Sequence, residues 1–155
     1  MEELDQLRSR LAALEKENEL LSKQNRINES LYLSILDAIP INIYLEDPEG
    51  QTLYANKHAC LANDKNLDEL IGITVFDIFP QHIAEVNRAT DLEVWRQRKL
   101  VTKELPTGFN GKEQHMFSGK TILQIAESNQ DFLLGFGLDI TDRVRAEQLL
   151  RESEE

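Results

Sequence analysis

The chain has 155 residues, of which 41% are hydrophobic and 29% are charged, and its formal net charge at pH 7 is −11. This length accommodates one compact domain of roughly 100 residues with helical extensions, but not two full domains. The acidic balance argues against a general nucleic-acid-binding surface, because such a surface needs clustered Lys and Arg to displace the counterions of phosphates.

Cysteine content and hydropathy limit the kinds of site and the cellular compartment that can be expected for the protein. Cys60 is the single cysteine, so an intramolecular disulfide and a multi-thiolate metal site are excluded. The most apolar run, 31–45, is interrupted by Asp37 and Pro40 and falls short of the roughly 18 uninterrupted apolar residues of a membrane span. We therefore expect a cytoplasmic protein without a membrane span.

Residues 1–29 carry a heptad repeat. Leucines occupy the d positions, and Asn18 occupies an a position, a combination that favours a parallel two-stranded coiled coil because a buried Asn pairs best with its own copy. The sequence therefore predicts a homodimer. A solvated single helix, or a helix packed on its own domain, is the alternative. The predicted interface residues of this segment are Leu4, Leu7, Leu11, Leu14, Asn18 and Leu21.

A short helix and a hairpin are expected next. Residues 31–39 have a helical apolar pattern, which Pro40 ends because its ring disfavours a helical residue before it. Residues 41–45 and 51–55 alternate like strands around the turn 47–50, and this pattern predicts a β-hairpin.

Helices dominate the middle of the chain. Residues 56–63, 67–71 and 74–79 are expected to form short helical turns, and 81–99 one longer helix. The apolar spacing predicts an inward face on this longer helix. Its members are Ile83, Val86, Thr90, Val94 and Trp95.

Three strands complete the pattern, at 100–107, 114–127 and 132–139, with turns at 108–111 and 128–131. Two strands, a group of helices and three strands predict an α+β fold, with a five-stranded antiparallel sheet and the helices inserted between its second and third strands.

Several short motifs in this order resemble those of PAS sensor domains. They are Asp47-x-x-Gly50, Tyr54-Ala55-Asn56, Leu70-Ile71-Gly72 and Asp139-Ile140-Thr141. The resemblance implies a PAS domain at 30–143, which includes the helix 31–39, and a signalling helix or linker at 144–155. It also implies that the chain is a fragment of a larger bacterial-type signalling protein.

The junction after the last strand is the first candidate site. An Asp at the start of a helix can accept hydrogen bonds from the free backbone donors of the first turn and complements the helix dipole. The resemblance implies an ion pair between Asp139 and Arg143, and a signal-relay role for Asp139, Ile140, Thr141 and Arg143. Ordinary helix capping without a switching role is the alternative.

A ligand pocket between the sheet and the helices is the second candidate site, because PAS domains commonly bind small molecules there. For every candidate lining residue, plain core packing remains the alternative. The candidates are Asn56, Phe76, Ile78, Phe79, Val86, Leu123, Gly135 and Gly137.

The two faces of the last strand differ in character. Leu133, Gly135 and Gly137 share one face, which comparison with the flavin-binding LOV branch of the family places inward. The other face is apolar and needs a cover, either the helix 31–39 or a second subunit. Phe136 and Leu138 on that face are therefore predicted dimer-interface residues.

The sequence lacks the residues that the known flavin and haem classes of PAS domains use to bind their cofactors. The stretch 74–79 lacks the cysteine of LOV flavin photochemistry, Gly137 stands where LOV domains have a flavin-contacting glutamine, and 86–90 lacks the histidine of haem-binding PAS domains. No histidine has a partner at metal-ligand spacing, so no metal is assigned. The identity of any cofactor remains unknown.

No catalytic motif is present, and the glycine-rich segment 108–112 is interpreted as a hairpin turn rather than a nucleotide loop. The prediction is a sensor or regulatory domain that relays a small-molecule or conformational signal to an output domain, with a two-component histidine kinase favoured by family frequency. A ligand-free dimerisation or interaction module of a signalling or transcriptional regulator, and a diguanylate cyclase parent, are the alternatives.

Overall fold

The computed structural model describes residues 1–107 and 113–154. The chain divides into two units, Met1–Ala38 and Ile39–Glu155. The predicted turn at 108–111 and the glycine-rich segment 108–112 lie outside the described residues.

The first unit is a single helix, α1, Glu2–Ala38. We expected a boundary at residue 30 between a coiled coil and a separate helix, but α1 runs through this position without a break. The segment contains neither Gly nor Pro, and Gln24 and Asn28 form a side-chain hydrogen bond along the helix at 3.1 Å. None of the described residues of α1 is buried.

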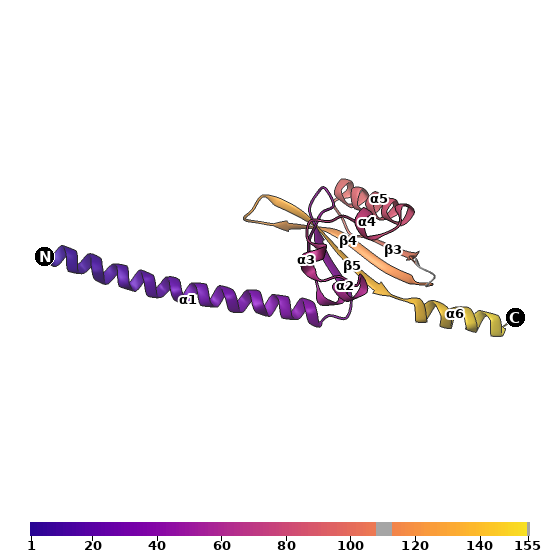
Figure 1. The fold of residues 1–155 in the computed structure, drawn as a ribbon, viewed down its shortest axis with the longest axis horizontal. Helices are drawn as coiled ribbons and strands as arrows, with labels where there is room; N and C mark the ends of the chain where they lie inside the picture. Colours follow the sequence, from indigo (N-terminus) through magenta and orange to yellow (C-terminus); the bar gives the residue numbers. More distant parts are fainter. Residues whose placement is uncertain (108–112, 155) are drawn as a thin grey trace. The chain divides into compact units, whose positions relative to one another are not determined.

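The second unit contains a five-stranded antiparallel sheet with the strand order β2-β1-β5-β4-β3 (Figure 1). This arrangement confirms the predicted α+β class. The strands are β1 (Asn42–Glu46), β2 (Thr52–Ala55), β3 (Val101–Pro106), β4 (His115–Ile125) and β5 (Gln130–Asp139). Four helices connect β2 to β3, and a fifth follows β5. They are α2 (Lys57–Ala62), α3 (Leu67–Leu70), α4 (Val75–Ile78), α5 (Gln81–Gln97) and α6 (Thr141–Glu154).

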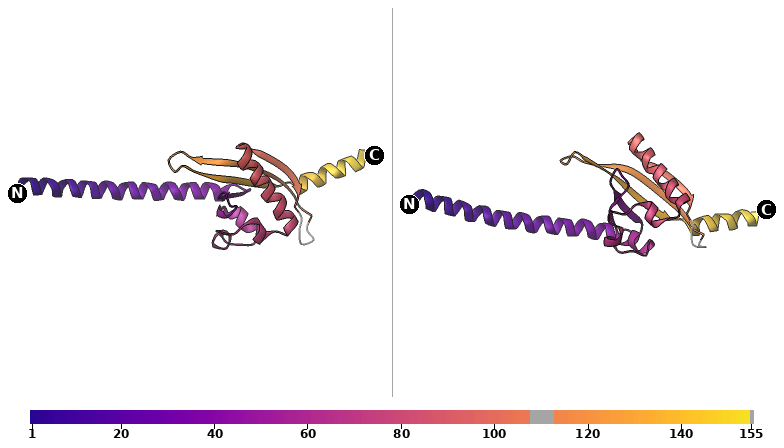
Figure 2. Two further views of the ribbon diagram at one scale, coloured as in Figure 1. Left: turned by 90° about the horizontal axis from the view of Figure 1, so that it is seen from above. Right: turned by 45° about the horizontal axis from the view of Figure 1, so that its top comes forward.

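The sheet buries one face beneath α5 (Figure 2). Along β5, Leu133, Gly135 and Gly137 are buried, whereas the residues between them are less buried. This alternation confirms the predicted inward orientation of the glycine face. Tyr44 of β1 and Lys120 of β4 both pair with Gly135, so the three residues form one row across the inner face.

Gly135 makes this row possible. A Cβ atom at residue 135 would lie 2.2 Å from Cζ of Tyr44, far inside any allowed contact. The phenol ring of Tyr44 therefore lies directly over the glycine backbone. Of the two alternatives for Gly135, a ligand pocket or plain packing, the second holds directly above it, because a side chain of the protein fills this space.

Helix α5 supplies the cover of the inner face, but its buried side is displaced from the predicted one. Ile83, Thr90 and Val94 are buried as expected, and Ala84 and Asp91 join them. Val86 is 48% exposed, so its predicted inward position is wrong. At about 100° per residue, the buried positions centre near Asn87, and Val86 lies about 100° away from that centre.

Helices α2 and α3 pack at the β1–β2 end of the sheet, around a small apolar cluster of Ala55, Ala59 and Leu70. Local capping explains where these short helices begin. Asn56 accepts a hydrogen bond from the backbone N–H of Ala59, and Asn66 and Glu69 form a reciprocal capping box.

Candidate functional site

The junction between β5 and α6 is built around the Asp139 carboxylate. Its Oδ1 accepts hydrogen bonds from the backbone N–H of Thr141 at 2.9 Å and from the Thr141 hydroxyl at 2.5 Å. Its Oδ2 accepts a third bond from Gln114 at 3.2 Å. These bonds, those of Thr141 first, hold the pKa of Asp139 below its usual value. Asp139 thus satisfies a free donor at the beginning of α6, as the sequence predicted.

Ile140 and Thr141 anchor the beginning of α6 to β4. The N–H of Ile140 donates to the carbonyl oxygen of His115 at 2.9 Å, and the hydroxyl oxygen of Thr141 accepts from the N–H of His115 at 3.0 Å. Both residues are buried. Beyond Thr141, none of the described residues of α6 is buried, so the helix is fixed to the sheet at its first turn.

Arg143 does not form the ion pair with Asp139 that the resemblance implied. Its guanidinium contacts Glu104 of β3 at 2.8 Å and Glu147, one turn later in α6, at 3.6 Å. The physical reason is local: the Asp139 carboxylate turns towards Thr141 and Gln114. Arg143 therefore connects α6 to β3 through two half-exposed side chains.

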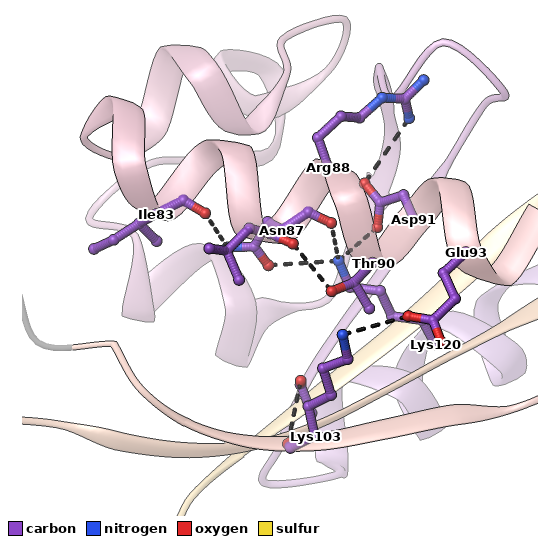
Figure 3. A network of polar contacts seen from close by, with 10 residues as sticks. Ile83, Asn87, Arg88, Thr90, Asp91, Glu93, Lys103 and Lys120 are labelled. Atoms are coloured by element: carbon purple, nitrogen blue, oxygen red, sulfur yellow. Dashed lines mark hydrogen bonds and ion pairs between the residues drawn. The ribbon is translucent and has the colours of Figure 1, made fainter.

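A second polar site lies between the sheet and α5 (Figure 3). The Lys120 ammonium donates to Oδ1 of Asp91 at 2.5 Å and to the backbone and side-chain oxygens of Asn87 at 3.4 Å. Lys120 is 2% exposed and Asp91 is fully buried. A buried pair of this kind fixes the position of α5 on β4, since each charge depends on the other.

Tyr44 borders this ion pair, with its ring centroid 5.9 Å from the Lys120 ammonium. Burial raises the pKa of the Tyr44 hydroxyl to about 12, against the opposing effect of the Lys120 charge. Burial alone lowers the pKa of Lys120, but the charge of Asp91 and its hydrogen bond to the ammonium raise it above its ordinary value. Lys120 is therefore an ammonium and Tyr44 a neutral phenol at neutral pH.

Glu46 of β1 completes the site and is 3% exposed. Burial, followed by repulsion from Asp91, raises its pKa to about 7, although Lys120 and Arg88 oppose the shift. Arg88 of α5 donates to the carbonyl oxygen of Pro48 at 2.9 Å, and its Nη1 lies 3.9 Å from Oδ2 of Asp91.

Sequence patterns did not predict this charged group. The available signals were Asp91, which interrupts the apolar face of a long amphipathic helix, and Lys120, which lies in a strand with an inward face. Each residue alone resembles an ordinary surface charge. Their contact joins positions 29 apart in the chain and needs the register of β4 against α5, which no local pattern contains.

Asn56, a candidate pocket residue, has structural contacts at both ends of its amide. Its Oδ1 accepts from the N–H groups of Ile43 at 3.0 Å and Ala59 at 2.9 Å, and its Nδ2 donates to the carbonyl oxygen of Ile41 at 2.9 Å. Asn56 therefore joins β1 to α2.

The structure does not gather the other candidate pocket residues around one cavity. Phe76 is 45% exposed, and Ile78 and Phe79 are partly buried. Leu123 pairs with Phe132 and lies on the sheet face opposite to Lys120, so its predicted place in the pocket is wrong. A Cβ on Gly137 would meet the flexible end of Met116 at 3.1 Å.

Two of the surface hollows among the described residues are lined by side chains other than the predicted pocket residues. One hollow is lined by Ala89, Leu92, Glu93 and Arg96 on α5. The other is lined by Lys57, Cys60, Leu61, Asp64, Lys65, Asn66 and Glu69 around α2 and α3.

Among residues 1–107 and 113–154, no three His, Cys, Asp or Glu side chains lie together in a way that would hold a metal ion. No helix within these residues combines the length and the apolar character required to cross a bilayer.

Comparison with known proteins identifies the family. The sequence model of the PAS fold matches residues 36–145. The chain belongs to the PAS family. This PAS domain is 30% identical over 125 residues to the uncharacterized protein y4lL of Sinorhizobium fredii (strain NBRC 101917 / NGR234). The match covers 79% of the chain but only 15% of that relative.

Solved structures show the same fold. The PAS domain of BvgS from Bordetella pertussis superposes with a TM-score of 0.64 at 18% identity, over 82% of this chain and 96% of that one. A PAS domain from a two-component sensor histidine kinase gives a TM-score of 0.58 at 18% identity, over 74% of this chain and 98% of that one.

Proposed function

We propose that this chain is a sensor or regulatory PAS domain that dimerises through α1 and relays its conformational state through α6 to an output domain. The observation that carries this proposal is the junction after β5. Ile140 and Thr141 are buried and bonded to the backbone of β4, whereas the rest of α6 is exposed or only partly buried.

The junction gives the relay a physical route. Asp139 is the last residue of β5 and bonds to the first residue of α6, so a change in the twist or position of β5 moves the first turn of that helix. Thr141 extends the connection to β4. Asp139, Ile140, Thr141 and Arg143 are therefore the proposed relay residues.

Dimerisation is supported by the character of α1. A long helix with no buried residue leaves its leucine stripe exposed in the single chain, and Leu7, Leu14 and Leu21 are each at least 50% exposed. Helices in proteins gain most of their stability by packing an apolar face against other parts of the structure. The heptad pattern with Asn18 favours a second parallel copy as that partner.

Within the dimer proposal, Leu4, Leu11 and the d-position leucines form the coiled coil, and Phe136 and Leu138 on the outer sheet face form a second contact. Replacing Leu14 and Leu21 together by Gln should produce monomers in sedimentation velocity. The matched control replaces Leu20 and Ile27, which are exposed residues of α1 outside the a and d positions of the repeat. A persistent dimer in the first variant would assign the association to the domain itself.

The proposed output domain is a histidine kinase of a two-component system in the cytoplasm, with a diguanylate cyclase as the alternative. The fold likeness to a PAS domain from a two-component sensor histidine kinase supports the kinase, and the short coverage of y4lL fits a fragment of a longer protein. A boundary between coiled coil and PAS domain near residue 30, and a linker from 144, remain part of this proposal.

A ligand-free relay is a second candidate function, and one specific observation favours it. The Tyr44 ring occupies the space over Gly135 on the inner face, where a ligand was expected. Native mass spectrometry and an absorption spectrum of the protein purified from cells distinguish the two. Additional mass or visible absorption supports a ligand sensor, and the bare dimer mass supports the relay.

The relay itself is tested by fusing the chain in frame to a histidine kinase core and measuring autophosphorylation. Asp139→Ala should leave the domain folded and change kinase output, because it removes the bonds that tie β5 to α6. Asp142→Ala, an exposed residue in the same turn, is the matched control. Equal output from the Asp139→Ala and unaltered fusions would reject the proposed route.

A further inference from the structure

Four charged side chains, Glu46, Arg88, Asp91 and Lys120, form what we call the charged cluster between the sheet and α5. Glu46 belongs to β1, Arg88 and Asp91 to α5, and Lys120 to β4. The cluster therefore joins three elements that are far apart in the sequence. Three of its four residues are almost completely buried.

The carboxylate oxygens of the cluster differ in their hydrogen-bond and ion-pair partners. Lys120 and Oδ1 of Asp91 satisfy each other at 2.5 Å. Oδ2 of Asp91 is buried without a hydrogen-bond partner in the described part of the chain, and the guanidinium of Arg88 lies 3.9 Å from it. Oε2 of Glu46 is buried and has no hydrogen-bond partner among the described residues. An ionised carboxylate in such a position is costly, whereas a protonated one removes the second buried anion beside Asp91.

We propose that the carboxyl group of Glu46 is a proton-responsive latch: its protonated form lets α5 pack closely on β1 and β4, and its ionisation loosens that packing. The ionised form adds a second buried anion within the electrostatic reach of Asp91. Because Lys120 already bonds to Asp91, Glu46 is the carboxyl group of the cluster that gains least from ionisation.

Titratable and charged groups on several elements influence whether the Glu46 carboxyl group is protonated or ionised. Tyr44 lies on the same strand, and Asp47 follows in the turn. Arg88 and Asp91 face Glu46 from α5, and Lys120 faces it from β4. Asp91 and Asp47 favour its protonated form, whereas Lys120 and Arg88 favour its ionised form. Burial favours the protonated form and is the largest single effect, so the pKa lies near neutrality.

Movement of α5 would reach the β1–β2 turn directly. Arg88 donates to the carbonyl oxygen of Pro48, and Gly50 has a positive φ of 85° with no side chain, where a Cβ would lie 2.9 Å from Nη1 of Arg88. The guanidinium thus lies against the turn backbone. Loosening of α5 by ionised Glu46 therefore also loosens this turn.

The full chain alone, without any output domain, is sufficient to test the latch. The carboxyl carbon of Glu46, labelled with ¹³C, is titrated by NMR between about pH 4 and pH 9. We expect a midpoint within about one unit of pH 7, shifted far above an unperturbed glutamate. A midpoint below about pH 5 would overturn the proposal, because the carboxyl group would then not respond near neutral pH.

Hydrogen exchange provides the structural readout. Backbone amides of α5 should exchange at least about tenfold faster at pH 8 than at pH 5.5, after correction for the intrinsic pH dependence. Glu46→Gln mimics the protonated form and should abolish this difference. Glu49→Gln, an exposed glutamate in the same hairpin, should retain it. Retention of the full difference in Glu46→Gln would overturn the latch, and the NMR midpoint decides should that variant not fold.

Discussion

The two polar sites of this PAS domain differ in how their charges are satisfied. At the β5–α6 junction, the Asp139 carboxylate is exposed and accepts three hydrogen bonds, and its pKa is lowered. Beneath α5, Glu46 is buried and its pKa is raised to about 7. Asp139 therefore stabilises the fold as an anion, whereas Glu46 stabilises it as a neutral acid. The pKa values of the two carboxyl groups shift in opposite directions because one is exposed and hydrogen-bonded and the other is buried.

The largest expected effect is loss of the buried pair beneath α5. Lys120→Met should lower the free energy of unfolding by about 3–5 kcal/mol, because it leaves the Asp91 carboxylate buried without its cation. Urea denaturation at pH 7 measures the loss. The double variant with Asp91→Leu should recover much of it, since the buried carboxylate that lacked its Lys120 partner is then absent. A loss below about 1 kcal/mol would mean that water solvates the Asp91 carboxylate. The site beneath α5 would then not differ from the exposed junction in how its charges are satisfied.

The next effect concerns the glycine that lets Tyr44 border the cluster. Gly135→Ala should cost about 1–3 kcal/mol or more, because the new methyl group would overlap the Tyr44 ring. Gly137→Ala is the matched control and should cost less, since its nearest neighbour is the flexible end of Met116. Thermal unfolding of both variants measures the difference. Equal losses would show that the inner face is not held by the Tyr44–Gly135 contact.

At the junction, a smaller effect with the opposite pH dependence is expected. Asp139→Ala should cost about 0.5–2 kcal/mol at pH 7, as loss of a helix cap does. Since the pKa of Asp139 is lowered on folding, its stabilisation is present above the unfolded value of 3.8 and is lost as pH falls through the folded pKa. The stability difference between Asp139→Ala and the unaltered chain should therefore disappear in acid. A difference that instead grew in acid would contradict the role of an ionised cap.

The two sites also differ in how far the sequence predicted them. The Asp139 capping bonds join residues two positions apart, so a local motif indicated them correctly. The same motif implied the wrong partner for Arg143, because Glu104 lies 39 positions away on β3. The order of strands and helices along the chain followed from patterns within single segments, and the inward glycine face followed from alternation together with the LOV comparison, whereas the spatial order of the strands was not predicted. The charged cluster required the packing of α5 on β1 and β4, and the apolar pattern placed Val86 on the inner face incorrectly.

The smallest expected effect concerns Arg143, whose position the local motif indicated but whose partner it did not. Glu104→Gln should change the free energy of unfolding by less than about 1 kcal/mol, because both partners are half exposed and water screens the pair. Urea denaturation at low and at high salt measures this, and the small loss should shrink further with salt. Glu147→Gln removes the weaker contact of Arg143 and is the matched control. A loss above about 2 kcal/mol that persisted in salt would place the Arg143–Glu104 pair with the buried cluster, and α6 would then be held on the sheet by charge as well as by its first turn.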